Sequence, residues 1–116
     1  MTWDEIKQEV EAHGGVRTMA VDTLREAHGA GKMGVHIRGQ ISSQLAGMGL
    51  GHVPRELPNY SHDTVRIYKR GTPAGNLIEA VLETGEGNDR KIVEQTSVSG
   101  QDFAEVVRQI RELVAE

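Results

Sequence analysis

The sequence predicts a single α+β domain over residues 1–116, and three observations lead to this prediction. Apolar residues recur at helical spacing through residues 1–50, the part that we expect to be helical. Residues 64–70 instead alternate between apolar and polar side chains, as a half-buried strand does. An apolar stripe at helical spacing returns after residue 99. The chain contains no cysteine, which excludes disulfides and thiolate metal sites, so the fold must depend on an aliphatic core.

Three helices are predicted in the first 50 residues, over 3–12, 17–28 and 33–47. Thr2 and Glu5 have the spacing of a capping box, in which each side chain satisfies a free backbone N–H at the start of a helix. The third helix has an apolar face that we expect to line the core. Its residues are Met33, Ile37, Ile41, Leu45 and Met48.

Residues 64–96 are predicted to form a small antiparallel β-sheet. Its strands are expected over 64–70, 77–83 and 90–96, with glycine-rich turns between them. The preceding residues, 49–63, contain two prolines and are predicted to be an irregular connection.

A last helix is predicted over 99–116, with Ser99 and Asp102 at its start. Its apolar stripe consists of Phe103, Val106, Val107, Ile110, Leu113 and Val114. The stripe has two possible uses, docking on the sheet of its own chain or forming a homodimer seam. Because aromatic residues are only 3 % of the chain, the core is expected to be thin, which favours burial against a second copy.

Positive charge is concentrated in the middle of an acidic chain. Residues 16–72 carry eight Lys/Arg against four Asp/Glu, whereas the whole chain has a net charge of −4. Such segregation favours a surface that faces a polyanion. The five histidines are not paired at i,i+4, and the serines lack a nucleophile-elbow context. We therefore expect no catalytic residues, no metal, no cofactor and no enzymatic activity.

The segments 24–34, 37–41 and 45–50, followed by a strand pair, resemble a winged helix-turn-helix, and the resemblance extends from Arg17 to Leu82. It implies a role in transcription regulation, with the third helix in the major groove of double-stranded DNA and the strand pair at the flanking backbone. The residues expected at the groove are Lys32, Arg38, Gln40, Ser42 and Ser43. Those expected at the backbone are Arg66, Tyr68, Lys69 and Arg70.

Two alternatives remain open. A protein-interaction or adaptor domain of similar shape is favoured by the net negative charge and by the single arginine, Arg38, on the third helix. In that case the basic strand would be a solvated sheet face, paired with Glu79 or Glu83. A small enzyme with a substrate site in residues 49–63 is the more distant alternative. The acidic opening and the lack of an apolar run of about 18 residues predict a cytoplasmic protein without a membrane span.

Overall fold

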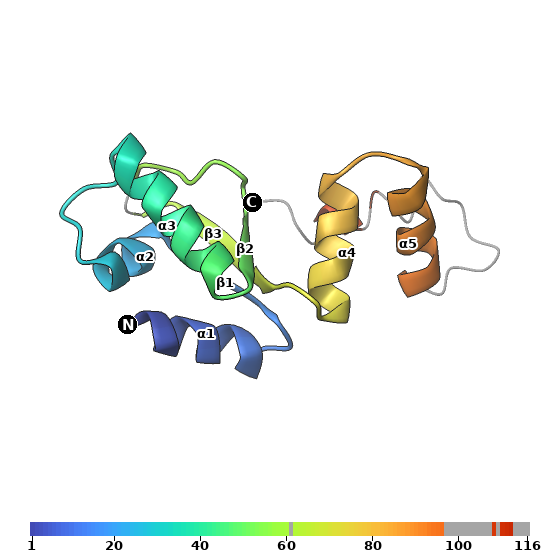
Figure 1. Cartoon of the computed structure of the whole chain (residues 1–116), viewed down its shortest axis with the longest axis horizontal. Helices are drawn as coiled ribbons and strands as arrows, with labels where there is room; N and C mark the ends of the chain where they lie inside the picture. Colours follow the sequence, from blue (N-terminus) through green and yellow to red (C-terminus); the bar gives the residue numbers. More distant parts are fainter. Residues whose placement is uncertain (61, 97–107, 109, 113–116) are drawn as a thin grey trace.

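The computed structural model describes residues 1–60, 62–96, 108 and 110–112. It confirms the α+β class, with helices and a three-stranded antiparallel sheet (Figure 1). The elements follow in the order α1 (Trp3–Ala12), β1 (Val16–Ala20), α2 (Val21–His28), α3 (Val35–Gly47), β2 (Leu50–Val53), β3 (Thr64–Lys69), α4 (Pro73–Leu82) and α5 (Glu86–Thr96). Residues 110–112 are helical as well.

The sheet is built around β3, which pairs antiparallel with β1 on one side and with β2 on the other. Val65 and Ile67 of β3 are fully buried on the inner face of the sheet, as their alternation predicted. Tyr68 points to the outer face and is also buried, at 4 % exposure. The central strand is therefore covered on both faces, although the sequence indicated a polar outer face.

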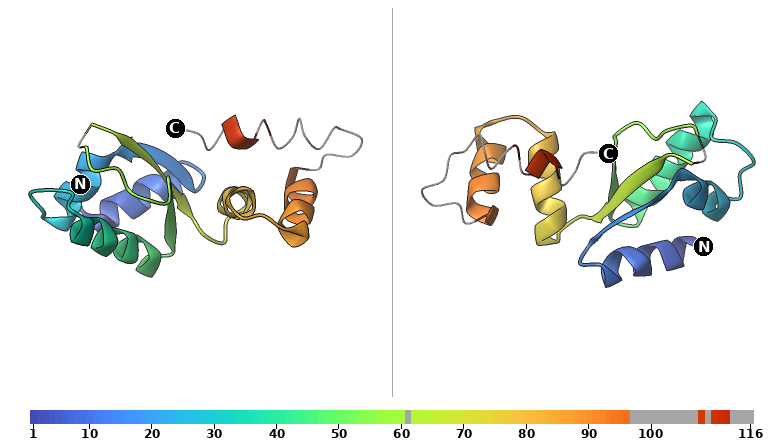
Figure 2. Two further views of the ribbon diagram at one scale, coloured as in Figure 1. Left: turned by 90° about the horizontal axis from the view of Figure 1, so that it is seen from above. Right: turned by 180° about the vertical axis from the view of Figure 1, so that it is seen from behind.

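Helices α1, α2 and α3 cover the inner face of the sheet (Figures 1 and 2). The predicted core face of the third helix is confirmed, since Met33, Ile41 and Leu45 are buried and Ile37 and Met48 pack against them. The rest of this main core is formed by Ile6, Val10, Val21, Leu24, Leu50, Leu57, Val65 and Ile67. All of these residues are aliphatic, in agreement with the composition.

The first helix has its predicted bounds, and Thr2 and Glu5 form the capping box in both directions. The predicted bounds of the second helix, 17–28, were wrong at the start, because Val16–Ala20 is strand β1 and α2 begins only at Val21. Gly14 and Gly15 both have positive φ, which turns the chain back along β3. The ladder with β3 then overrides any local helical preference of Val16–Ala20.

Two of the strands predicted within 64–96 are helices, and so this part of the chain is not a hairpin unit. Thr72 caps α4 by accepting a hydrogen bond from the Gly75 N–H, and Pro73 occupies the first turn, where it needs no hydrogen-bond partner. Residues 77–83 therefore lie mostly in α4, and residues 90–96 in α5. Strand β2, which pairs with β3, was not predicted. It lies within the connection 49–63, which was expected to be irregular.

Close contacts fix α4 against the outer face of the sheet. Ile78 of α4 packs against Tyr68 and Val53 in a second apolar cluster. The Tyr68 ring lies over Gly51 of β2, where any Cβ would overlap it. At the start of α4, a Cβ on Gly75 would overlap the backbone carbonyl oxygen of Lys69. Only glycine allows these two approaches.

A third apolar cluster joins α4 and α5, which lie beside the sheet unit (Figure 2). It contains Ala80, Ile92 and Ile110. Ile110, a residue of the predicted dimer stripe, is therefore buried within its own chain. The other five, Phe103, Val106, Val107, Leu113 and Val114, lie outside the described residues, and the dimer stays a prediction. No helix in the described part is both long and apolar enough to cross a membrane.

A half-buried pair of hydrogen bonds ties α3 to β2. His52 Nδ1 lies 2.6 Å from the backbone oxygen of Pro54, which can only accept, so Nδ1 carries the proton. The neutral ring then accepts at Nε2 from the Ser42 hydroxyl, at 2.9 Å. Burial lowers the pKa of His52, and nearby Arg70 acts in the same direction, against the opposing effect of the Pro54 hydrogen bond. The folded chain therefore favours the neutral imidazole.

The first prediction compares one substitution at two helical glycines. Gly75→Ala should lower the free energy of unfolding by about 1–3 kcal/mol, because the added methyl group meets the Lys69 carbonyl. Gly39→Ala should raise it by about 0.5–1 kcal/mol, because a Cβ there meets no atom within 4 Å and alanine favours the helix. Urea denaturation measures both. Equal effects at the two positions would contradict the close approach of α4.

The second prediction concerns the pH dependence of stability. Because the pKa of His52 is lowered on folding from its ordinary 6.5, the unfolded chain binds the proton more tightly. The His52 contribution is complete above about pH 6.5 and is lost as the pH falls toward its lower folded-state pKa. His52→Gln should therefore lose less stability between pH 7.5 and about pH 5.5 than the wild type does. His36→Gln, at an exposed histidine of α3, is the control, and an unchanged profile for His52→Gln would contradict the prediction.

Candidate nucleic-acid interface

The side of α3 that faces away from the core forms a solvent-exposed stripe. It repeats with a spacing of four residues and consists of Val35, His36, Gly39, Gln40, Ser43 and Gln44, here called the α3 stripe. These residues line a shallow hollow along the helix. No atom of a neighbouring element lies within 4 Å of a Cβ built on Gly39, so the α3 stripe is not packed against another described element at this position.

The α3 stripe contains no Asp, Glu, Lys or Arg. No acidic residue occurs between Glu26 and Glu56, so α3 and both of its connections lack negative side chains. Imidazole, amide and hydroxyl groups can donate and accept hydrogen bonds, as base edges in the major groove require. The stripe therefore carries hydrogen-bonding groups that could contact base edges.

Gln40 is held in place by a contact from α2. Its Oε1 lies 2.9 Å from His28 Nε2, and the His28 ring makes an edge contact with Trp3 of α1 at a centroid distance of 6.1 Å. This chain of contacts orients the amide on the exposed side of α3. The sequence offered no signal for it, because the three residues come from three helices.

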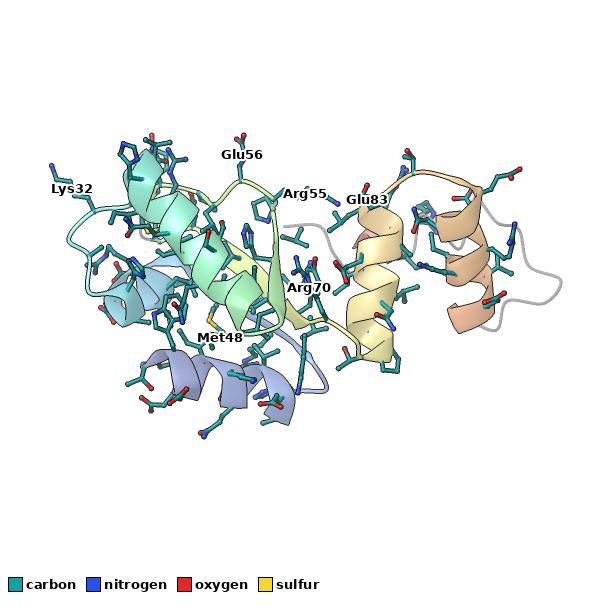
Figure 3. The ribbon with its side chains drawn as sticks, in the orientation of Figure 1. Lys32, Met48, Arg55, Glu56, Arg70 and Glu83 are labelled. Carbon is teal, nitrogen blue, oxygen red and sulfur yellow. The ribbon has the colours of Figure 1, made fainter. Side chains whose placement is uncertain are left out.

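Two of the residues predicted at the groove are engaged inside the protein. Arg38 is half-buried and donates to the backbone oxygen of Leu57 at 3.3 Å, and Ser42 is hydrogen-bonded to His52. Lys32 and Ser43 are exposed. Lys32 extends from the loop before α3, beyond the helix N-terminus (Figure 3). Of the predicted groove residues, Lys32, Gln40 and Ser43 are therefore accessible.

Two of the residues predicted at the DNA backbone, Arg66 and Tyr68, do not lie on one surface with the α3 stripe. Arg66 and Tyr68 lie on the outer face of the sheet, whereas α3 covers the inner face. Tyr68 is buried under α4, and burial, followed by the nearby Glu79 carboxylate, raises the pKa of its hydroxyl. Lys69 pairs with Glu11 of α1.

Arg70 pairs with Glu79 as the alternative interpretation expected, but the acid comes from helix α4 and not from a neighbouring strand. The distance from Arg70 Nε to Glu79 Oε2 is 3.4 Å. Arg55, which sequence reasoning did not select, lies nearby and pairs with Glu83. The Glu83 hydrogen bond raises the pKa of the Arg55 guanidinium. Figure 3 shows the two arginines between the sheet and α4, on the side of α3 opposite Lys32.

The part of the chain that the structure describes holds no group of three or more His, Asp or Glu residues arranged to bind a metal ion. Comparisons of the whole chain with protein-family models, with curated proteins and with solved structures found no match.

Proposed function

We propose that this chain is a non-enzymatic DNA-binding module of winged helix-turn-helix type, with α3 as the helix that enters the major groove. The observation that carries the proposal is the exposed, acid-free α3 stripe. Helix α3 has 13 residues, so it is about 20 Å long, and a B-DNA major groove about 12 Å wide admits it.

The arrangement of elements supports the winged-helix assignment. Helices α2 and α3 are consecutive and share one apolar core, and strands β2 and β3 follow as an antiparallel pair. Strand β1 adds a third strand on the other side of β3. With α3 in the groove, Lys32 at one end of the helix lies where it can meet a phosphate, and such contacts fix orientation without reading sequence.

A protein-interaction domain is the second candidate, and one observation favours it. Val35 begins the α3 stripe with 69 % of its surface exposed, beside the small residue Gly39. An apolar side chain next to a residue without a side chain suits the close approach of a protein helix. A measurement of DNA binding distinguishes the DNA-binding module from the protein-interaction domain.

The third prediction tests DNA binding through its salt dependence. Binding to a labelled random duplex, measured by fluorescence anisotropy, should be detectable at about 50 mM salt and weaken as salt is added. Lys32→Ala should reduce the slope of log K against log salt by about one, the loss of one phosphate contact. Lys91→Ala, on α5, is the matched control and should leave the slope unchanged. No binding by the wild type at about 100 μM protein would remove the DNA proposal in favour of the protein-interaction domain.

The fourth prediction tests the α3 stripe itself. Gly39→Leu places a large side chain on the open side of α3, where a Cβ meets no neighbouring element within 4 Å, so the variant should fold. Blocking the groove contact should weaken duplex binding at least about tenfold, which corresponds to about 1.4 kcal/mol. Gly87→Leu on α5, which also has open space around it, is the control and should bind as the wild type does. Unchanged binding by folded Gly39→Leu would mean that α3 is not the contact surface.

A further inference from the structure

Two acidic residues in the C-terminal part of α4 and at its end form ion pairs with two arginines that lie beside α3. Glu79 lies in α4, and Glu83, four residues later, is the residue that caps the C-terminus of this helix, so both acids lie at the same end of α4. Glu79 reaches Arg70, at the end of β3, and Glu83 reaches Arg55, in the connection between β2 and β3. The Arg55 Nη2 to Glu83 Oε1 distance is 2.5 Å (Figure 3).

All four side chains line one hollow of about 340 Å³. Ser42 and Ala46 of α3 form part of its wall, so the hollow opens beside the C-terminal half of the proposed DNA-reading helix. A phosphodiester in this hollow would lie next to the α3 stripe. The acids of α4 are therefore located where a DNA backbone would pass if α3 entered the groove.

Both ion pairs are exposed enough to be exchanged. The side chains of Arg55 and Glu83 are each 58 % exposed, and those of Arg70 and Glu79 are 47 % and 40 % exposed. Exposed ion pairs contribute only about 0–1 kcal/mol, so breaking them costs the fold little. A guanidinium binds carboxylate and phosphate oxygens through the same donors, and a phosphate group can take the place of each carboxylate.

We propose that Arg55 and Arg70 form a phosphate-binding site for the nucleic-acid backbone, and that Glu79 and Glu83 of α4 occupy this site in the free protein. The inference rests on the proposed DNA-binding function. Helix α4 then acts as a built-in competitor, because a phosphodiester must displace its carboxylates to reach the arginines. Without the acids, two phosphate contacts become available in addition to the one proposed for Lys32.

The experiment compares two charge-matched double variants of the full chain. Glu79→Gln with Glu83→Gln frees both arginines while keeping the size of the side chains. Glu86→Gln with Glu94→Gln makes the same change in net charge on α5, at exposed positions away from the hollow. Affinity for a random duplex is measured from about 50 to 200 mM salt, and circular dichroism checks that each variant is folded.

We expect the Glu79/Glu83 variant to bind at least about tenfold more tightly at 50 mM salt than the Glu86/Glu94 variant. Its slope of log K against log salt should be steeper by up to about two, one unit for each new phosphate contact. Glu83→Gln alone should steepen the slope by about one. Adding Arg55→Gln and Arg70→Gln to the Glu79/Glu83 variant should reverse the gain.

The outcomes separate this inference from the proposed function. If the wild type binds duplex DNA but the Glu79/Glu83 variant binds no more tightly than its charge-matched control, the phosphate site is wrong and the DNA-binding function stands. If neither the wild type nor the Glu79/Glu83 variant binds, both are wrong. Binding by the Glu79/Glu83 variant alone would contradict the DNA-binding function of the wild type, although it would show that the two acids block the arginines.

Discussion

The position of β3 at the centre of the sheet is the constraint on which the rest of the structure depends. Its inner face buries Val65 and Ile67 against the three N-terminal helices, and its outer face buries Tyr68 under α4. Both sheet neighbours and the approach of α4 fit around this strand, since the Tyr68 ring needs the bare backbone of Gly51 and the end of β3 needs that of Gly75. A strand that is packed on both faces cannot itself offer a broad binding surface, whereas the outer side of α3 is open to solvent.

The orientation of α3 follows from the same packing. Ile41 and Leu45 are held in the main core, and Ser42 is tied to His52 of β2, so rotation of the helix about its axis would expose apolar side chains and break a half-buried hydrogen bond. The residues between these anchors must then face solvent. The α3 stripe therefore requires no change in the core, because it uses only positions that the core does not need.

The sequence predicted those parts of the fold in which local pattern and tertiary structure agree. The capping box of α1, the core face of α3 and the alternation of β3 are local signals, and all three were confirmed. Strand β1 and helices α4 and α5 were missed, since pairing with β3 determines the first and the apolar runs in the other two fit either period. In the candidate site, Gln44 could have been predicted from the sequence, because it follows Gln40 by four residues. Arg55 could not have been predicted, since only the fold brings it beside Arg70 and α4.

An acidic chain can bind a polyanion only if its negative charges are kept away from the contact surface or neutralised there. Here Glu9 and Glu11 of α1 pair with Arg17 and Lys69, and the acids of α4 pair with Arg55 and Arg70. Much of the local positive charge is therefore compensated within the chain, and the α3 stripe is left neutral. In the proposed complex, few phosphate contacts would be free at first, and affinity would depend on hydrogen bonds from α3 to base edges more than on counterion release. Because the pairs on Arg55 and Arg70 are exposed and weak, these two arginines would add backbone contacts in the proposed complex by exchanging an internal carboxylate for a phosphate. Such an exchange leaves nonspecific binding weak and gives the larger gain where α3 fits the bases as well.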